Sequence, residues 1–202
     1  MSDEQTRPDF LDGSNRYRLL YPVEYMTGDT PQRLDMLQLR RLTLADRIIL
    51  DEPVVYSEKV TRILEDMTGE MRAVLLKIDA TDADRIDQIF GYFLPKAAAI
   101  DPTVRPDFLT AANRYTLLHP VDYRTEEGMQ QMTEIQLRRL TLADRLTLDE
   151  PISYSERVAR ILVNMTAQPK SLILKIDAAD ADRIDQIFGY FLQPGTATGA
   201  IS

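Results

Sequence analysis

The stretch DADRIDQIFGYFL occurs twice in the chain, as Asp82–Leu94 and, without a change, as Asp180–Leu192. Acidic residues precede each copy, and a carboxylate at the start of a helix can accept hydrogen bonds from the free backbone N–H groups of the first turn. The apolar residues that follow have helical spacing, and they are Ile86, Ile89, Phe90, Phe93 and Leu94. The acidic part of the stretch therefore predicts the start of a helix, capped by Asp79, and the aromatic part predicts the buried face of that helix.

The repeated stretch belongs to a longer duplication with a constant offset of 98 residues, which pairs Pro22 with Pro120 and needs no gap from Arg7 to Leu94. A repeat of about 90 residues is long enough to be a small domain, whereas solenoid repeats have about 20 to 50 residues. We therefore expect two domains rather than a solenoid. The expected parts are a first domain at 7–95, a proline-containing linker at 96–104, a second domain at 105–193 and a disordered tail at 194–202.

Each repeat begins with a pattern that is typical of a β-hairpin. In the segment Tyr17–Tyr25, large apolar residues alternate with other residues, and a period of two indicates a half-buried strand. Pro22 cannot donate to a strand ladder, so the strand is expected to lie at an edge or to carry a bulge there. A polar loop follows, and the alternation resumes at Leu37 and Leu39. Two strands across a polar loop predict a hairpin.

Short helices are predicted after the hairpin. Thr43 and Asp46 can cap the first helix, which must end before Pro53 because a residue that precedes proline avoids the helical conformation. Ser57 can cap the second helix, whose apolar residues share one face: they are Tyr56, Val60, Ile63, Leu64 and Met67. With the helix of the repeated stretch, each repeat is predicted to be an α+β domain in which a β-hairpin is followed by about three short helices.

The composition excludes several classes of functional site. The 202 residues include no cysteine and one histidine, so the chain offers no thiolate nucleophile, no cysteine-ligated zinc and no histidine-rich metal site. The formal net charge of -8 gives no net attraction to nucleic acids. No run approaches the ~18 apolar residues of a membrane helix, and the first residues lack the features of a secretory signal. We expect a cytoplasmic protein that binds neither nucleic acid nor membrane.

The acidic cluster and the histidine are weak candidates for chemistry. The aspartates between Asp79 and Asp87 do not match the ligand positions of an EF-hand in any register, so helix capping and a solvated helix face explain them better. His119 takes the place of Tyr21 in the first repeat, which argues against a general base. The sequence also lacks a phosphate-binding loop and a nucleophile elbow. It therefore predicts a protein that is not an enzyme, with no catalytic residue, no metal site and no cofactor.

Two kinds of residue are candidates for contact with a partner. Adjacent arginines at the end of the second strand could hold a phosphate or an acidic partner, although neighbours on a strand point to opposite faces and one of each pair can instead form a surface ion pair. A tyrosine in the last helix falls off the main apolar stripe, where it could lie at an interface or simply pack on the surface. The candidates are Arg40, Arg41, Tyr92, Arg138, Arg139 and Tyr190.

The order of these motifs resembles the small tail assembly chaperones of contractile-tailed and Mu-like phages. The resemblance covers nearly all of Tyr17–Leu94 and of Tyr115–Leu192. In the first repeat it rests on LLYPVEY at 19–25, LQLRRLTLAD at 37–46, RILEDMTG at 62–69, LKIDATDADRI at 76–86 and the closing Phe-Leu at 93–94. The succession of these motifs, rather than any one of them, carries the resemblance.

The resemblance implies a non-enzymatic protein of a phage or prophage that acts in the cytoplasm of the bacterial host. Such a protein binds the tape-measure protein, promotes tail assembly and is absent from the mature virion. The tail tube protein is a second implied partner, and self-association is left open. Members of the family usually have one such unit, so the duplication departs from the family pattern. The alternative is a structural tail or adaptor protein that is retained in the virion.

Overall fold

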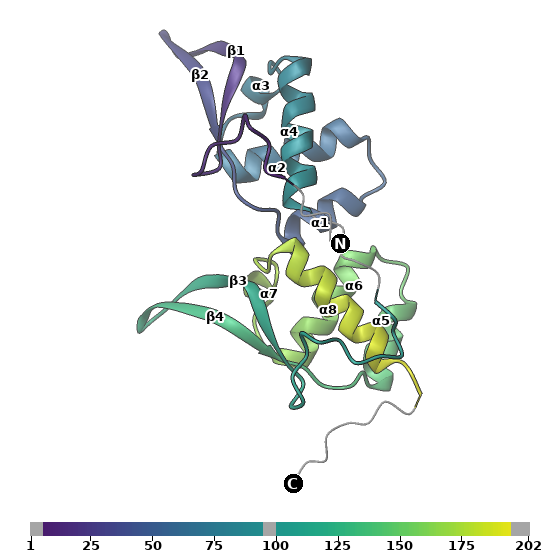
Figure 1. The fold of residues 1–202 in the computed structure, drawn as a ribbon. Helices are drawn as coiled ribbons and strands as arrows, with labels where there is room; N and C mark the ends of the chain where they lie inside the picture. The colour runs from purple at the N-terminus through teal and green to yellow at the C-terminus, as the bar shows by residue number, and fades with distance from the viewer. Residues whose placement is uncertain (1–5, 95–99, 195–202) are drawn as a thin grey trace. The chain divides into compact units, whose positions relative to one another are not determined.

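The computed structural model describes residues 6–94 and 100–194. These residues form an α+β structure with two antiparallel hairpins, each followed by helices (Figure 1), which confirms the predicted fold class. Part of the predicted linker at 96–104, and all but the first residue of the predicted disordered tail at 194–202, lie outside the described residues.

The elements of the two repeats correspond one to one. The first repeat contains β1 (Arg16–Thr27), β2 (Thr30–Gln38), α1 (Leu44–Asp51), α2 (Tyr56–Thr68), α3 (Arg72–Leu75) and α4 (Ala80–Phe93). The second contains β3 (Arg114–Thr125), β4 (Gly128–Gln136), α5 (Leu142–Asp149), α6 (Tyr154–Thr166), α7 (Lys170–Ile173) and α8 (Ala178–Phe191). With the single-turn helices α3 and α7, each repeat has four helices, where about three were predicted. The start of α2 also differs from the prediction, because Val55 rather than Ser57 stands at its N-cap.

The hairpins carry the predicted bulge. Pairing between β1 and β2 shifts its register between Arg18 and Val23, and the pairing of β3 with β4 shifts between Thr116 and Val121. Proline stands within each interruption, where a missing backbone N–H costs no ladder hydrogen bond. The bulge turns backbone N–H groups of the strand away from the partner strand, so they need another acceptor.

A buried aspartate from the last helix supplies that acceptor. Asp82 is fully buried and accepts hydrogen bonds from the backbone N–H groups of Leu20 at 2.8 Å and Tyr21 at 3.0 Å, and from the hydroxyl of Tyr17. Asp79 is the cap that the sequence predicts, since it accepts from the backbone N–H of Thr81 at 2.8 Å. The prediction that helix capping and a solvated helix face account for the whole cluster is wrong for Asp82, because this carboxylate links α4 to the β1 bulge.

The second repeat contains the same link. Asp180 accepts from the N–H groups of Leu118 at 2.7 Å and His119 at 3.1 Å, and from the hydroxyl of Tyr115 at 2.6 Å. Burial raises the pKa of the Asp180 carboxyl above its usual range, although the three hydrogen bonds act in the opposite direction. Burial and the adjacent carboxylate also raise the pKa of Tyr115 far above its usual value.

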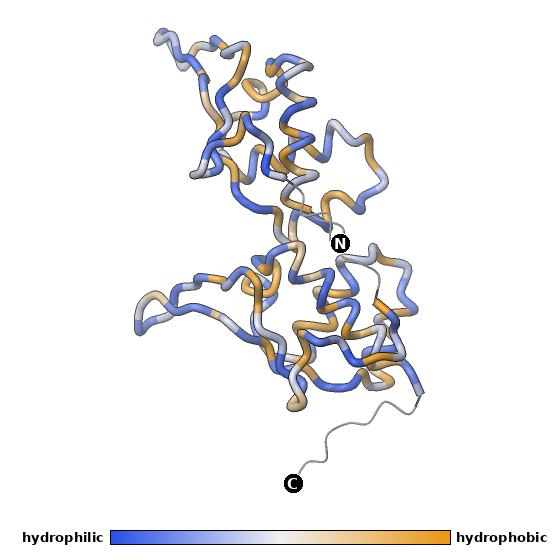
Figure 2. The backbone as a smooth tube through the Cα atoms, viewed as in Figure 1, coloured by the Kyte–Doolittle hydropathy of each residue, from blue (hydrophilic) through white to orange (hydrophobic). Residues whose placement is uncertain are grey.

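The apolar core of each unit lies between the hairpin and the helices. Ile86, Ile89, Phe90 and Phe93 of α4 are buried, as the spacing predicts, and Leu94 is half-buried. Figure 2 shows apolar and polar residues alternating along the hairpins and the helices, as expected for elements with one buried face. Among the described residues, no helix combines the length and the apolar character needed to cross a membrane.

The compact units differ from the sequence repeats at one helix. The first unit ends at Leu42 and resumes at Glu52, whereas Thr43–Asp51 groups with the second unit. The helix α1 therefore packs within the second unit, on α6 and α8, although its sequence belongs to the first repeat. Leu44 of α1 is only 1% exposed and is part of the core of the second unit.

Polar contacts also hold α1 in the second unit. Its first two backbone N–H groups, which have no partner inside the helix, donate to carbonyl groups in the α7–α8 turn. Its last residue, Asp51, accepts from the first turn of α6, where a negative charge is favourable. The contacts join Leu44 N to Ile176 O at 2.8 Å, Ala45 N to Leu174 O at 3.1 Å, Ser155 N to Asp51 Oδ2 at 2.9 Å, and Arg47 to Asp182.

Candidate partner-binding grooves

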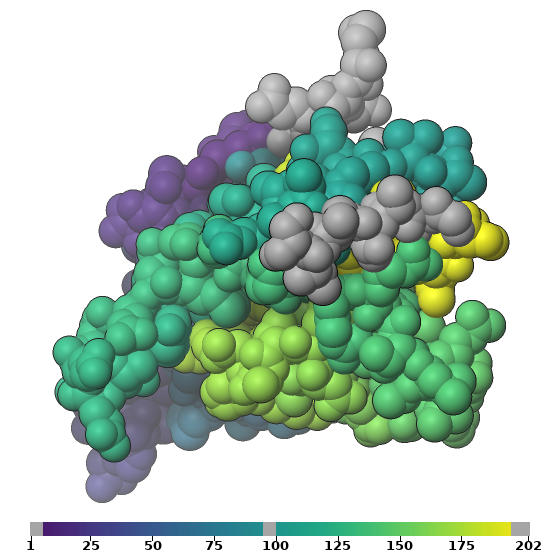
Figure 3. All heavy atoms as spheres, turned by 90° about the horizontal axis from the view of Figure 1, so that it is seen from below, coloured from purple at the N-terminus to yellow at the C-terminus, as the bar shows by residue number. Residues whose placement is uncertain are grey.

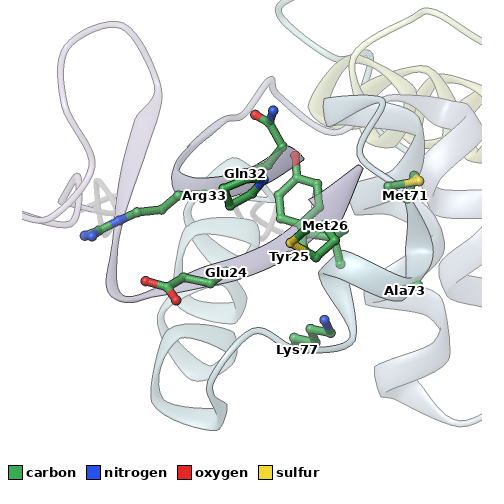
Figure 4. A pocket seen from close by; sticks show the side chains of 10 residues that line it. Glu24, Tyr25, Met26, Gln32, Arg33, Met71, Ala73 and Lys77 are labelled. Atoms are coloured by element: carbon green, nitrogen blue, oxygen red, sulfur yellow. The ribbon is translucent and has the colours of Figure 1, made fainter. Parts of the chain in front are cut away.

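An open groove of about 710 Å³ lies between the hairpin and α3 in the first unit (Figure 4). The hairpin wall belongs to the outer part of the strands, beyond the last buried pair of Val23 and Leu34. The hairpin residues of the lining are Glu24, Tyr25, Met26, Pro31, Gln32 and Arg33, and the residues from the other wall are Met71, Ala73, Val74 and Lys77.

Local chain geometry explains why this groove stays open. The strands continue outward from Val23 and Leu34 to a tight turn at Gly28, which has a φ of 59°, so their outer part extends past the core. On the other wall, Gly69 ends α2 in the left-handed conformation with a φ of 70°. The chain then reverses direction and presents Met71 just before the single turn α3.

The groove combines exposed methionines with a charged rim. The exposed fraction of Met26 is 58% and that of Met71 is 53%. Figure 4 shows Met71 on the helical wall and Tyr25 with Met26 on the hairpin wall, while Lys77 lies at one edge of the groove. Unbranched, polarizable methionines adapt to apolar side chains of different shapes. The arrangement suits an apolar segment with charged flanks, rather than a small polar molecule.

The second unit also has an open groove beside its hairpin, with a volume of about 480 Å³. Its walls are β4 and the region where α6 ends and α7 begins. Figure 3 shows the β3–β4 hairpin standing out from the helices of this unit. The lining residues are Tyr123, Gln131, Met132, Thr133, Glu134, Ile135, Gln136, Met165, Thr166, Gln168 and Leu172.

The two grooves share only three lining positions, and they differ in charge. Tyr25 of the first corresponds to Tyr123 of the second, and Val74 corresponds to Leu172. Arg33 is replaced by Gln131, and the lining of the second groove contains no basic residue. The first groove therefore suits a segment with some acidic character, whereas the second makes no such demand.

The four predicted arginines make contacts within their own units. Arg40 pairs with Asp66 at 2.5 Å, and Arg41 lies over the Phe93 ring at 6.0 Å. Arg138 pairs with the buried carboxylate of Asp144 at 2.6 Å, and Arg139 donates to the Phe191 carbonyl at 3.0 Å. Burial acts to raise the pKa of Asp144, but the hydrogen bonds from Arg138 and Thr141 outweigh it and keep that pKa below its usual value. These contacts stabilise the fold, and a role of the arginines in partner binding stays a prediction.

The two predicted tyrosines differ in exposure. Tyr92 is half-buried and its ring centroid lies 5.6 Å from that of Phe93. Tyr190 is 6% exposed, and the guanidinium group of Arg105 lies 5.8 Å from its ring centroid. Neither tyrosine lines either groove. A role in partner binding stays a prediction for both.

The remaining candidates for chemistry do not converge on a site. Within residues 6–94 and 100–194, no group of three or more histidine, cysteine, aspartate or glutamate residues is placed to hold a metal ion. The backbone N–H of His119 donates to Asp180, so this residue lies at the strand bulge rather than in a groove.

The groove methionines were missed by the reasoning from sequence. That reasoning favoured residues present in both repeats, and Met26 and Met71 are replaced by Arg124 and Pro169 in the second repeat. The available signal was their position, since Met26 lies in the turn region of a hairpin and Met71 follows the helix-ending Gly69.

When the chain is compared with protein-family models, curated proteins and solved structures, no match is found.

Proposed function

We propose that the chain is a non-enzymatic phage tail assembly chaperone that holds segments of the tape-measure protein in its two hairpin grooves. The observation that carries the proposal is an open groove beside each hairpin, the first bearing methionines that are 58% and 53% exposed. Exposed apolar side chains in a groove can accept the apolar face of an amphipathic helix. A tape-measure chain, which is long, helical and partly apolar, offers many such faces.

Duplication and charge support the same proposal. Two linked grooves raise the effective concentration of the second contact once the first is made, so two weak contacts can hold one long chain. The difference in charge between the grooves allows them to take different segments of the same partner. A net charge of -8 favours solubility of a complex with an apolar partner.

Co-expression with the tape-measure protein tests the proposal. The wild-type chain is expected to keep that protein soluble and to co-purify with it. The double variant Met26→Glu/Met71→Glu places two negative charges in the first groove, which suits a segment with some acidic character, and should reduce the recovered complex about tenfold or more, because desolvating a charge in an apolar contact is costly and like charges repel. Adding Thr133→Arg, on the exposed wall of the second groove, should remove the remaining binding.

The matched control is Met129→Glu, which changes an exposed methionine of the second hairpin that lines neither groove. It should leave the complex unchanged. If the tape-measure protein stays insoluble beside a well-folded wild-type chain, the chaperone proposal fails. Mass spectrometry of purified virions then decides whether the chain is instead a structural tail or adaptor protein.

A further inference from the structure

A third groove is distinct from the two hairpin grooves. In the second unit it is filled by α1, and in the first unit the corresponding groove is open. In the first unit its walls are α2, α4 and the α3–α4 turn, and they enclose about 310 Å³. Ile176 of the second unit is fully buried, whereas its counterpart Ile78 is half-buried. Ala181 is 2% exposed, whereas its counterpart Ala83 is exposed. The same apolar surface is thus covered in one unit and uncovered in the other.

The helix that corresponds to α1 has an exposed apolar face. α5 has the sequence LADRLTLD and α1 has LADRIILD. The exposed fraction of Leu142 in α5 is 78% and that of Leu146 is 65%, whereas Leu44 of α1 is 1% exposed. The chain therefore carries one open groove and one helix of the type that fills this groove.

The polar groups of the groove and of α5 also match. Leu142 and Ala143 have backbone N–H groups without a hydrogen-bond partner in the described parts of the chain, and the carbonyl groups of Ile78 and Leu76 stand where Ile176 and Leu174 accept from α1. In the second unit, Asp51 accepts a hydrogen bond from the backbone N–H of Ser155. The counterparts of these two residues are Asp149 of α5 and Ser57 of the first unit, and both are exposed.

The charges are complementary as well. The groove of the first unit has Asp84 and Asp87 on its rim. Arg145 of α5 is exposed and corresponds to Arg47, which pairs with Asp182, the counterpart of Asp84. Arg47 also lies 6.0 Å from the ring centroid of Tyr154, and Tyr56 holds the equivalent place in the first unit. An arginine from α5 would find both of these partners.

We propose that α5 of one copy of the chain binds in the groove of the first unit of a second copy, in the orientation that α1 has in the second unit. The contact joins two different surfaces, so each copy can donate a helix to one neighbour and receive a helix from another. Such a contact closes into a ring when the rotation between copies permits it, and otherwise it extends into a filament. The protein is therefore expected to self-associate in a concentration-dependent manner.

Cross-linking between single-cysteine chains tests the proposal directly, because the natural chain has no cysteine. One chain carries Arg145→Cys and a second, differently tagged chain carries Asp84→Cys. A short thiol-to-thiol cross-linker should join these two chains to each other in preference to forming either homodimer. A chain with Arg47→Cys/Asp182→Cys is the positive control, since this pair is in contact within one chain. Replacing Arg145→Cys by Met129→Cys is the negative control.

Light scattering over a range of concentrations gives the second readout. The wild type should increase in mass with concentration, and Leu146→Glu or Arg145→Asp should weaken the association about tenfold or more. Combining Arg145→Asp with Asp84→Arg should restore it, which loss of folding could not explain. The proposal is overturned if the wild type stays monomeric at the highest attainable concentration. It is also overturned if a chain with both Arg145→Cys and Asp84→Cys is cross-linked only within itself.

Discussion

At the residue scale, Asp82 and Asp180 give the repeated stretch its first structural role. Each carboxylate is buried, and each accepts hydrogen bonds from two backbone N–H groups of a strand bulge and from a tyrosine hydroxyl. The sequence could not reveal this role, because an aspartate in the first turn of a helix satisfies the requirements of a solvated cap equally well. Only the tertiary fold brings the strand bulge to the carboxylate.

Replacing Asp82 by asparagine should destabilise the first unit. The amide offers one acceptor oxygen, and its NH₂ group would face backbone donors, so we expect a loss of about 2 to 4 kcal/mol in the free energy of unfolding. Urea denaturation followed by circular dichroism measures the loss. The control Asp9→Asn changes an exposed aspartate and should stay within about 0.5 kcal/mol of the wild type. Equal effects of the two substitutions would refute a special role of Asp82.

The Tyr115 hydroxyl should make stability depend on alkaline pH. Burial and the neighbouring Asp180 raise its pKa above the ordinary value of 10.0, so its stabilising contribution is present below pH 10.0 and is lost as the pH rises through the folded-state pKa. The variant Tyr115→Phe should be less stable than the wild type by about 1 kcal/mol near neutral pH, and the difference should shrink above about pH 10. Thermal denaturation between about pH 8 and about pH 11 tests this. A difference that stays constant over the series would contradict the assignment.

At the element scale, most strands and helices were predictable, because the spacing of apolar residues and the positions of prolines determine them locally. The alternation in Tyr17–Tyr25, the bulge at Pro22 and the apolar stripe of α4 all appear in the structure. The apolar face predicted for α2 is only partly buried, since Tyr56 is 51% exposed and Val60 is half-buried. The spacing of apolar residues shows which face seeks burial, but it does not show whether another element covers that face.

The matched helices α1 and α5 allow a test of which face is covered. Leu44→Ala removes a side chain from the core of the second unit and should cost about 2 to 5 kcal/mol. Leu142→Ala changes an exposed residue at the same position of the other repeat, and in dilute solution it should cost less than about 0.5 kcal/mol. Hydrogen exchange should show lost protection in α6 and α8 for the first variant. Lost protection confined to α2 and α4 would instead show that α1 packs in the first unit, and it would contradict the packing described above.

At the scale of the whole molecule, the duplication was predictable, but the division into compact units was not. An offset of 98 residues is visible in the sequence itself. Nothing in that pattern distinguishes a helix that packs on its own repeat from one that packs on the other, because α1 and α5 are nearly the same. The candidate partner-binding grooves were missed for a related reason, since they depend on how far the hairpins extend beyond the core.

Dividing the chain between the repeats tests whether α1 of the first repeat packs in the second unit. Residues 1–99 and 100–202, expressed together with a tag on one fragment only, should co-purify because α1 of the first fragment packs in the second unit. The second fragment carries Leu146→Glu, so that α5 cannot bind in the groove of the first unit. Leu44→Asp in the first fragment should then abolish co-purification, because a buried unpaired carboxylate is costly. Adding Leu142→Asp to the second fragment is the matched control and should have no further effect. Fragments that never associate, although each is folded, would contradict this packing of α1.

The packing of α1 also has a consequence for synthesis on the ribosome. Translation proceeds from the N-terminus, so α1 leaves the ribosome well before α6 and α8, which form its groove, have been made. At about 5 to 20 residues per second, the interval is on the order of ten seconds. Once α2 to α4 have been made, the groove in its own repeat is available to α1 before the one in the second unit exists. We therefore expect α1 to bind first in its own repeat and to move when α6 and α8 are complete.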